Sequence, residues 1–233
     1  MKAADVMSSR VISVGPEATV GEIARLLLER HISAVPVVDT GGRIIGIVSE
    51  GDLMRRAETG TERHRSWWLR AFGDTAILAS DYVKSHALRA RDVMTRDVVS
   101  VTPETKLGQI ANLLEKHRIK RVPVVRGGKP VGIVSRANLL QAFAVAKPAP
   151  NGGAEAADDR GIREKLLAEL DRQPWWVDSI YTNIVVTEGV VHVWGMVRTD
   201  SERDALRIAA ERIPGVRQVD DHRTPYSAML STA

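Results

Sequence analysis

Hydrophobic and polar positions follow the same order twice along this chain. Each copy begins with an extended apolar run that meets a proline, and then places apolar residues at i, i+3, i+4 and i+7, the spacing of an amphipathic helix. A short apolar strand, a glycine turn, a second apolar strand and a final helix follow. The helix positions are Val20, Ile23, Ala24 and Leu27 in the first copy and Leu107, Ile110, Ala111 and Leu114 in the second. Each copy therefore predicts the element order β-α-β-β-α.

The two copies form an internal repeat. Aligned with each other, residues 3–39 and 90–126 are identical at 19 of 37 positions. Both begin Ala-x-Asp-Val-Met, pass through Val-Pro-Val-Val and reach Gly-Ile-Val-Ser. Such a repeat determines the architecture. Two copies predict two half-domains that bury a shared face and leave a pair of related clefts, which are the places to look for a ligand site.

The first predicted helix of each copy carries recognisable end residues. Thr19 and Thr105 are the expected N-caps, because a hydroxyl can accept a hydrogen bond from an amide of the first turn. His31 and His117 stand near the C-terminal ends of these helices, where a histidine is favourable. We therefore expect both histidines to be structural residues, not ligands.

The rest of the chain predicts a connector and a separate small domain. Residues 58–89 contain Trp67-Trp68 and other apolar positions that predict one or two amphipathic helices. Beyond a linker, a helix at about 161–172, a hairpin with a Glu188-Gly189 turn, a helix at about 200–213 and a strand from Val216 give α-β-β-α-β. The predicted parts are residues 1–57 (first repeat), 58–89 (helical connector), 90–146 (second repeat), 147–159 (flexible linker), 160–225 (C-terminal domain) and 226–233 (tail).

Composition narrows the class of protein. The hydrophobic content of 44% and the charged content of 27% are typical of a soluble globular protein. The chain has no cysteine, which excludes disulfides and thiolate chemistry. It has no apolar secretory segment at its start and no run of about 18 apolar residues, so we expect a cytoplasmic protein. Residues 92–147 carry ten basic and four acidic side chains; a basic cleft would attract a phosphorylated ligand, although a solvated basic surface explains the same counts.

The segment from Gly46 to Asp52 carries the clearest candidate chemistry. Its strand ends at Ser49, and Asp52 follows in the first turn of the next helix, so a hydroxyl and a carboxylate meet at one place. A carboxylate can accept two hydrogen bonds, which suits the 2′ and 3′ hydroxyls of a ribose, and the free amides of a helix N-terminus favour a phosphate. Alternatively, Ser49 is an N-cap and Asp52 only compensates the helix dipole. These residues leave both interpretations open.

The paired motifs resemble a tandem of CBS domains, called a Bateman module, over about residues 1–145. The resemblance implies an α+β fold in which two β-α-β-β-α repeats pack as a pseudo-symmetric pair, and a module that commonly forms a homodimer. It also implies two clefts for adenosine-containing ligands such as AMP, ADP, ATP, NAD or S-adenosylmethionine. The family's ribose-binding acid falls on Asp52, with Ser49 beside it. The adenine-contacting positions fall on Ile12, Ser13, Val14, Val35 and Pro36.

The second copy departs from this pattern. Asn138 stands at the acid position, beside Ser135, and an amide offers one acceptor oxygen where a carboxylate offers two charged ones. We therefore expect two unequal sites, with the Asp52 site the stronger. In some CBS proteins a basic residue before the Val-Pro-Val strand contacts phosphate, and here this place holds Lys120 and Arg121. The planar guanidinium of Arg121 suits a phosphate, while Lys120 is better explained as solvated surface.

The C-terminal domain resembles a BON domain, through the segments from Glu188 to Val197 and from Pro214 to Val219. This resemblance implies contact with phospholipid surfaces or with a protein partner. Trp175-Trp176 fits a core or interdomain contact at least as well as a surface contact. The basic and aromatic stretch 63–70 is interpreted as packing or a subunit interface, so nucleic acid is not an expected partner.

The sequence contains no pattern for catalysis. Metal-ligand spacing, a P-loop and a nucleophile elbow are all missing, so we expect no enzyme, no metal and no catalytic cofactor. The main hypothesis is a cytoplasmic regulatory protein that binds an adenine nucleotide between its repeats and relays its state through the BON domain. The alternative is a non-catalytic interaction or phospholipid-associating protein whose nucleotide site is weak or vestigial.

Overall fold

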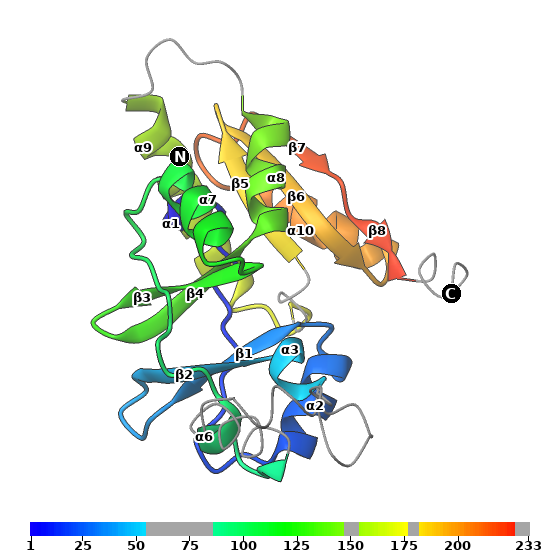
Figure 1. Cartoon of the computed structure of the whole chain (residues 1–233). Helices are drawn as coiled ribbons and strands as arrows, with labels where there is room; N and C mark the ends of the chain where they lie inside the picture. The colour runs from blue at the N-terminus through cyan, green and yellow to red at the C-terminus, as the bar shows by residue number, and fades with distance from the viewer. Residues whose placement is uncertain (55–85, 147–153, 177–181, 227–233) are drawn as a thin grey trace. The chain divides into compact units, whose positions relative to one another are not determined.

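The computed structural model describes residues 1–54, 86–146, 154–176 and 182–226 (Figure 1). The predicted connector helices, Trp67-Trp68 and the stretch 63–70 lie outside the described residues, as does the start of the predicted linker. The chain divides into two compact units. The first-repeat unit comprises Ile12–Val99 and Arg126–Pro130, and the second-repeat unit comprises Met1–Val11, Ser100–Val125 and Val131–Ala233. The first eleven residues therefore belong to the unit that contains most of the second repeat.

The first-repeat unit is built around a strand pair. Its elements are α2 (Val20–Glu29), β1 (Ala34–Val38), β2 (Ile44–Ser49), α3 (Glu50–Leu53) and α6 (Ala90–Val93). Strands β1 and β2 are antiparallel, with Ala34 opposite Ser49. The predicted first strand is reduced to a single parallel bridge between Val14 and Val37. Apolar side chains of α2, β1, β2 and α6 form one core.

The second repeat has the same construction. Its elements are α1 (Ala3–Val6), α7 (Leu107–Lys116), β3 (Arg121–Arg126), β4 (Lys129–Ser135) and α8 (Arg136–Val145), with β3 paired to β4 and a parallel bridge between Val101 and Val124. The short helices α1 and α6 at the Asp-Val-Met motifs were not predicted.

The N-cap prediction is right in the first repeat and wrong in the second. The Thr19 hydroxyl accepts a hydrogen bond from the Glu22 amide at 3.2 Å. Helix α7 instead has Lys106 as its N-cap, because Lys106 stands at the repeat position of Thr19. The hydroxyl of Thr105 lies one residue too early, and it accepts from the Thr102 amide at 3.1 Å.

Each Asp-Val-Met segment packs against the Gly-Ile-Val-Ser strand of the other repeat. Met94 covers Gly46 in the first-repeat unit, and Met7 covers Gly132 in the second-repeat unit. Backbone bonds hold each segment in place: Thr95 and Ile47 exchange two, and Ser8 and Ile133 exchange two. The N-terminal segment of each repeat thus packs in the unit of the other repeat. This exchange explains why the structural units do not coincide with the sequence repeats.

The C-terminal part of the second-repeat unit is a helix-covered sheet. Its elements are α9 (Ala154–Leu170), β5 (Thr182–Thr187), β6 (Val190–Val197), α10 (Asp200–Glu211), β7 (Gln218–Asp221) and β8 (Thr224–Pro225). The strand order is β5-β6-β7, and β8 also pairs with β6 (Figure 1). The predicted turn is present, because Glu188 and Gly189 have φ of 53° and 73°. Helix α9 begins within the segment predicted as linker, seven residues before the helix start expected at about 161.

Candidate functional site

The Asp52 carboxylate and the end of β2 form the cap of α3. Its Oδ2 atom accepts hydrogen bonds from the Ser49 amide at 2.9 Å and from the Ser49 hydroxyl at 2.7 Å. The capping role considered from the sequence is therefore present. It also fixes the carboxylate at the point where the strand becomes a helix, which is where a ribose-binding acid is expected.

The other predicted residues of this site lie on neighbouring segments of the same unit. The Val14 amide donates to the Pro36 carbonyl at 3.0 Å, and the Val38 amide donates to the Val14 carbonyl at 2.9 Å. Ala34, which precedes Val35, pairs with Ser49 in the β1–β2 register. The extended run Ile12, Ser13 and Val14 therefore lies beside β1, and β1 beside the cap. Val35 and Pro36 are buried, whereas Ser13 is exposed.

The second repeat contains the same cap with an amide in place of the acid. Asn138 Oδ1 accepts from the Ser135 amide at 2.8 Å and from the Ser135 hydroxyl at 2.7 Å. The Asn138 side chain is buried. The neighbouring run is also repeated, since the Val101 amide donates to the Pro123 carbonyl at 3.0 Å. The two caps differ in chemistry and not in backbone arrangement.

This difference changes the acceptor capacity of each cap. An amide oxygen has two lone pairs, and Asn138 uses its oxygen for two bonds, so only its NH₂ donors could serve a ligand. A carboxylate has about four acceptor sites and a negative charge, whereas an amide oxygen has two acceptor sites and no charge. The two sites are therefore unequal in what they can offer to a diol.

The predicted phosphate ligands lie beside the second cap. Arg121 is the first residue of β3 and is half-buried, whereas Lys120 is exposed. The Lys120 carbonyl accepts from the Arg136 amide at 3.1 Å, and the Ser33 carbonyl accepts from the Glu50 amide at 3.0 Å. In each repeat, the residue just before the Val-Pro-Val strand thus accepts a hydrogen bond from the first residue of the final helix.

Two arginines of α9 hold the N-terminal segment, and sequence reasoning missed both. Arg163 donates to the carbonyls of Ile184 at 2.8 Å, Ala4 at 2.9 Å and Met7 at 2.6 Å. Arg160 donates to the Asp5 carboxylate at 2.8 and 2.6 Å.

Arg163 is a buried cation. Burial lowers the pKa of its guanidinium to about 10, against the opposing effect of the Asp5 and Glu164 charges. Its spacing could have revealed it, because it stands three and seven residues before the core residues Leu166 and Leu170, in the apolar stripe of α9.

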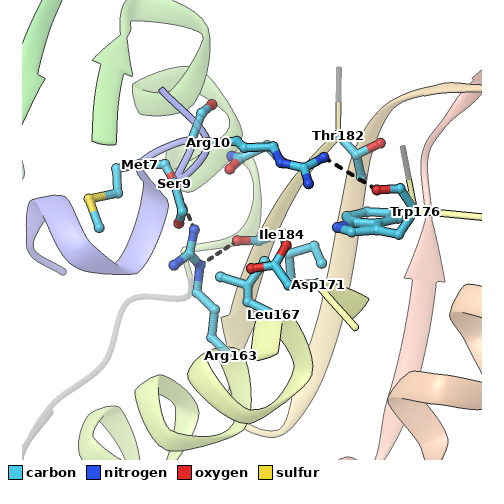
Figure 2. A pocket seen from close by; sticks show the side chains of 11 residues that line it. Met7, Ser9, Arg10, Arg163, Leu167, Asp171, Trp176, Thr182 and Ile184 are labelled. Atoms are coloured by element: carbon cyan, nitrogen blue, oxygen red, sulfur yellow. Dashed lines mark hydrogen bonds between the residues drawn. The ribbon is translucent and has the colours of Figure 1, made fainter. Parts of the chain in front are cut away.

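A pocket of about 60 Å³ lies next to Arg163. Residues 7–10, α9, Trp176 and the start of β5 line it. Figure 2 shows Arg163 reaching Met7 and Ile184, and Arg10 directed at the Trp176 carbonyl, 3.4 Å away. Ligand pockets usually measure about 300–1,000 Å³, so this one is too small for a nucleotide. Its volume corresponds to roughly four water molecules.

No helix among the described residues is long and apolar enough to cross a membrane.

Comparison with known proteins now identifies the domains. The sequence matches the CBS domain family at residues 3–58 and 90–145 and the BON domain family at residues 158–223. The chain belongs to the CBS-domain proteins and carries a C-terminal BON domain. The resemblances seen in the sequence are thereby confirmed, and so is the mixed α and β fold of a CBS pair.

Several known proteins resemble the part of the chain that contains the CBS pair. An uncharacterized protein of Methanocaldococcus jannaschii is 31% identical over 151 residues, which are 60% of this chain and 89% of that protein. The chloroplast CBS domain-containing protein CBSX1 of Arabidopsis thaliana is 32% identical over 140 residues, or 55% of this chain, and the match spans 57% of CBSX1. The crystal structure of CBSX2 in complex with AMP is 28% identical, with a TM-score of 0.54, and covers 63% of this chain and 99% of that one.

Proposed function

We propose that this protein is a non-catalytic regulator that binds an adenosine-containing ligand, AMP first of all, at the Ser49–Asp52 cap. The observation that carries the proposal is the Asp52 carboxylate fixed at the end of β2, with the run Ile12–Val14 and strand β1 beside it. The similar CBS pair of CBSX2 forms a complex with AMP. The family resemblance extends the proposal to a cytoplasmic homodimer, which light scattering and cell fractionation test.

In this proposal Asp52 accepts the ribose hydroxyls and the buried Val35–Pro36 segment contacts the adenine. The Asn138 site is the weaker one, because the amide oxygen of Asn138 already accepts two hydrogen bonds. Arg121 is the proposed phosphate contact of the Asn138 site in its own unit, since a guanidinium can form two parallel bonds to phosphate oxygens.

The BON domain is proposed to report the bound state through the N-terminal segment. Arg163 and Arg160 of α9 hold α1 through bonds to Ala4, Met7 and Asp5. Residues 7–11 join α1 to the Ile12–Val14 run, and in this proposal a change in that run acts through them on the segment that α9 holds. A ligand can shift this arrangement only if it binds two arrangements with different affinity.

The decisive experiment uses the isosteric variant Asp52→Asn. The second repeat already shows that an asparagine can form this cap, so the variant should keep the fold while it removes acceptor capacity and charge. Calorimetric titration with AMP should show an affinity at least about tenfold lower than in the wild type, because hydrogen bonds to charged groups contribute about 1.5–3 kcal/mol. The variant Asn138→Asp should gain affinity at the second site or bind a second equivalent of AMP.

The control is the melting temperature without ligand, which should change little in Asp52→Asn. A thermal-shift panel of AMP, ADP, ATP, NAD and S-adenosylmethionine identifies the preferred ligand, since a molecule that binds only the folded state raises the melting temperature. Equal AMP affinity in the wild type and in a folded Asp52→Asn variant would show that Asp52 does not contribute to AMP binding. An unchanged melting temperature with every ligand of the panel would favour the alternative of an interaction protein with a weak or vestigial nucleotide site.

A further inference from the structure

Three side chains with metal-binding donors meet on the sheet of the BON domain. Strands β6 and β7 lie side by side in the sheet (Figure 1). His192 on β6 and Asp220 on β7 are directly opposite each other in the parallel register, and His222 follows just after β7. His192 and Trp194 point to one side of β6, because side chains alternate along a strand. Asp220 lies beside His192, and the His222 ring stacks against His192 and Trp194 on that side. Val191 and Val193, the neighbours of His192, are fully buried in the helix-covered core, so the three donors occupy the opposite face of the sheet.

The donor atoms are nearly at the spacing that a metal ion requires. One donor atom from each of the three residues lies within 4.8 Å of the others, and His192 Nδ1 is 3.5 Å from Asp220 Oδ2. Ligands about 2.0–2.1 Å from a tetrahedral zinc ion lie roughly 3.4 Å apart. The first pair therefore already fits. His222 is exposed, so its ring has room to close the remaining gap.

Neighbouring groups keep the three donors near one another. The His222 ring stacks on Trp194 at a centroid distance of 4.1 Å and lies nearly parallel to His192 at 5.8 Å. The His222 amide donates to the Val193 carbonyl at 2.8 Å, and the Gln218 amide group donates to Asp220 Oδ1. Contacts of this kind orient metal ligands in proteins and raise their affinity.

We propose that His192, Asp220 and His222 form a binding site for one divalent transition-metal ion, with zinc as the reference ion. Two imidazoles and one carboxylate are ligands that zinc and its neighbours accept, whereas calcium and magnesium prefer oxygen ligands. Three protein ligands leave one coordination position for water. The bound ion links β7 to β6. The metal site uses none of the residues that are proposed to bind the nucleotide. It also revises the sequence-based expectation that the chain binds no metal.

The test is titration of the untagged full chain, stripped with EDTA, with ZnCl₂ and with CoCl₂. We expect one equivalent of Zn²⁺ per chain and the visible absorption of tetrahedrally bound Co²⁺. His222→Gln and Asp220→Asn should each weaken Zn²⁺ binding by at least about tenfold, since each removes one ligand. His117→Gln is the matched control, because His117 is an exposed histidine of the second repeat, and this variant should bind like the wild type.

Circular dichroism and tryptophan fluorescence should show that both cluster variants remain folded; Asp220→Asn keeps the shape of the side chain in case the loss of the His222 stack disturbs Trp194. The proposal is overturned if the wild type binds Zn²⁺ no more tightly than folded Asp220→Asn. It is equally overturned if His117→Gln loses as much affinity as His222→Gln. In either case the cluster is only a histidine–aspartate ion pair.

Discussion

Met94 occupies the space that a side chain on Gly46 would need. A Cβ built on Gly46 would come within 2.7 Å of Met94 Cγ, and one on Gly132 within 2.8 Å of Met7 Cγ. Both glycines are buried strand residues. A glycine is therefore required at this place in each repeat for packing, not for an unusual backbone angle.

We predict that Gly46→Ala and Gly132→Ala each lower the free energy of unfolding by about 1–3 kcal/mol, because the added methyl overpacks the core. Urea denaturation measures this change. Gly21→Ala and Gly108→Ala are matched controls: a Cβ on either helical glycine meets nothing within 4 Å, so these variants should keep or raise stability by up to about 1 kcal/mol. Met94→Ala should offset part of the loss in Gly46→Ala. If the double variant shows additive losses, Met94 is not the cause.

Replacing His31 or Arg118 with glycine should stabilise the protein. They stand at equivalent repeat positions, with φ of 43° and 52°. Each follows the C-cap residue of its helix in a Schellman motif, in which the Ile32 amide donates to the Leu27 carbonyl and the Ile119 amide to the Leu114 carbonyl, both at 3.0 Å. Because glycine adopts positive φ without steric strain, His31→Gly and Arg118→Gly should raise the free energy of unfolding by about 0.5–1 kcal/mol.

The control for this prediction lies one residue earlier. His117 has a φ of −90°, so His117→Gly should destabilise the protein through the lost backbone restriction alone. Thermal denaturation of the three variants decides the matter. A destabilised His31→Gly would show that the side chain contributes more than the backbone strain removes.

Glu22 should make the start of α2 sensitive to acid. Its carboxylate accepts from the Thr19 amide at 2.7 Å and from the Thr19 hydroxyl at 2.9 Å. The backbone bond from Thr19, followed by the hydroxyl bond, lowers the pKa of Glu22 below its usual value of 4.5. A carboxyl whose folded pKa is depressed contributes fully above its unfolded pKa, about 4.3, and loses this contribution as the pH falls through the folded value.

We therefore expect carbon NMR titration to give Glu22 a pKa below 4.5 and Thr19→Ala to raise it. Glu22→Gln should keep the cap but remove this pH dependence. The chain contains its own precedent, because Gln109 stands at the equivalent position and accepts from the Lys106 amide at 3.2 Å. The protection factors of the amides at the start of α2, which are corrected for the intrinsic pH dependence of exchange, should then stay constant from pH 5 to about pH 3 in Glu22→Gln. An ordinary Glu22 pKa in the wild type would contradict the prediction.

Arg163 should be essential for the attachment of α1. Arg163→Met should lower the free energy of unfolding by about 3 kcal/mol or more, because three carbonyls lose their donor. Arg172→Met is the control: its side chain is 76% exposed, and the change should be within about 0.5 kcal/mol. Hydrogen exchange should show the loss of protection at residues 3–7. Unchanged protection there would mean that α1 is held without Arg163.

The same position tests the proposed relay. In the wild type, AMP should change hydrogen exchange in α1 and in α9 as well as near Asp52. In Arg163→Lys, which keeps the charge but cannot reach three carbonyls, the change in α9 should shrink while AMP affinity stays within about twofold. An α9 response of full size in Arg163→Lys would place the relay elsewhere.

The sequence predicts the local elements well. It does not predict that the N-terminal segment of each repeat packs against the other repeat. The pairing of Ser49 with Asp52 follows from a spacing of three residues at a helix start, so that cap was foreseeable. The exchange of Met7 and Met94 was not, because both repeats carry the same methionine and the same glycine. Identical motifs predict identical contacts and cannot say which copy provides the partner.

Contacts between distant segments account for the other omissions. The position of Arg163 in the apolar stripe of α9 marks it as a buried cation, but the sequence does not show its partners, the carbonyls of Ala4 and Met7. His192 and Asp220 are far apart in the sequence and become neighbours only through the parallel pairing of β6 with β7. No short sequence motif predicts such a pair.

The placement of the first eleven residues also bears on synthesis of the chain. They leave the ribosome before the residues that they contact: Ala3 and Ala4 bond to Thr105 and Pro103, Met7 packs on Gly132, and Arg163 binds α1. At about 5–20 residues per second, roughly 8–30 seconds pass before Arg163 is made. During this interval residues 1–11 have no completed docking site, and a pause or truncation before α9 would leave their apolar side chains exposed to chaperones and proteases.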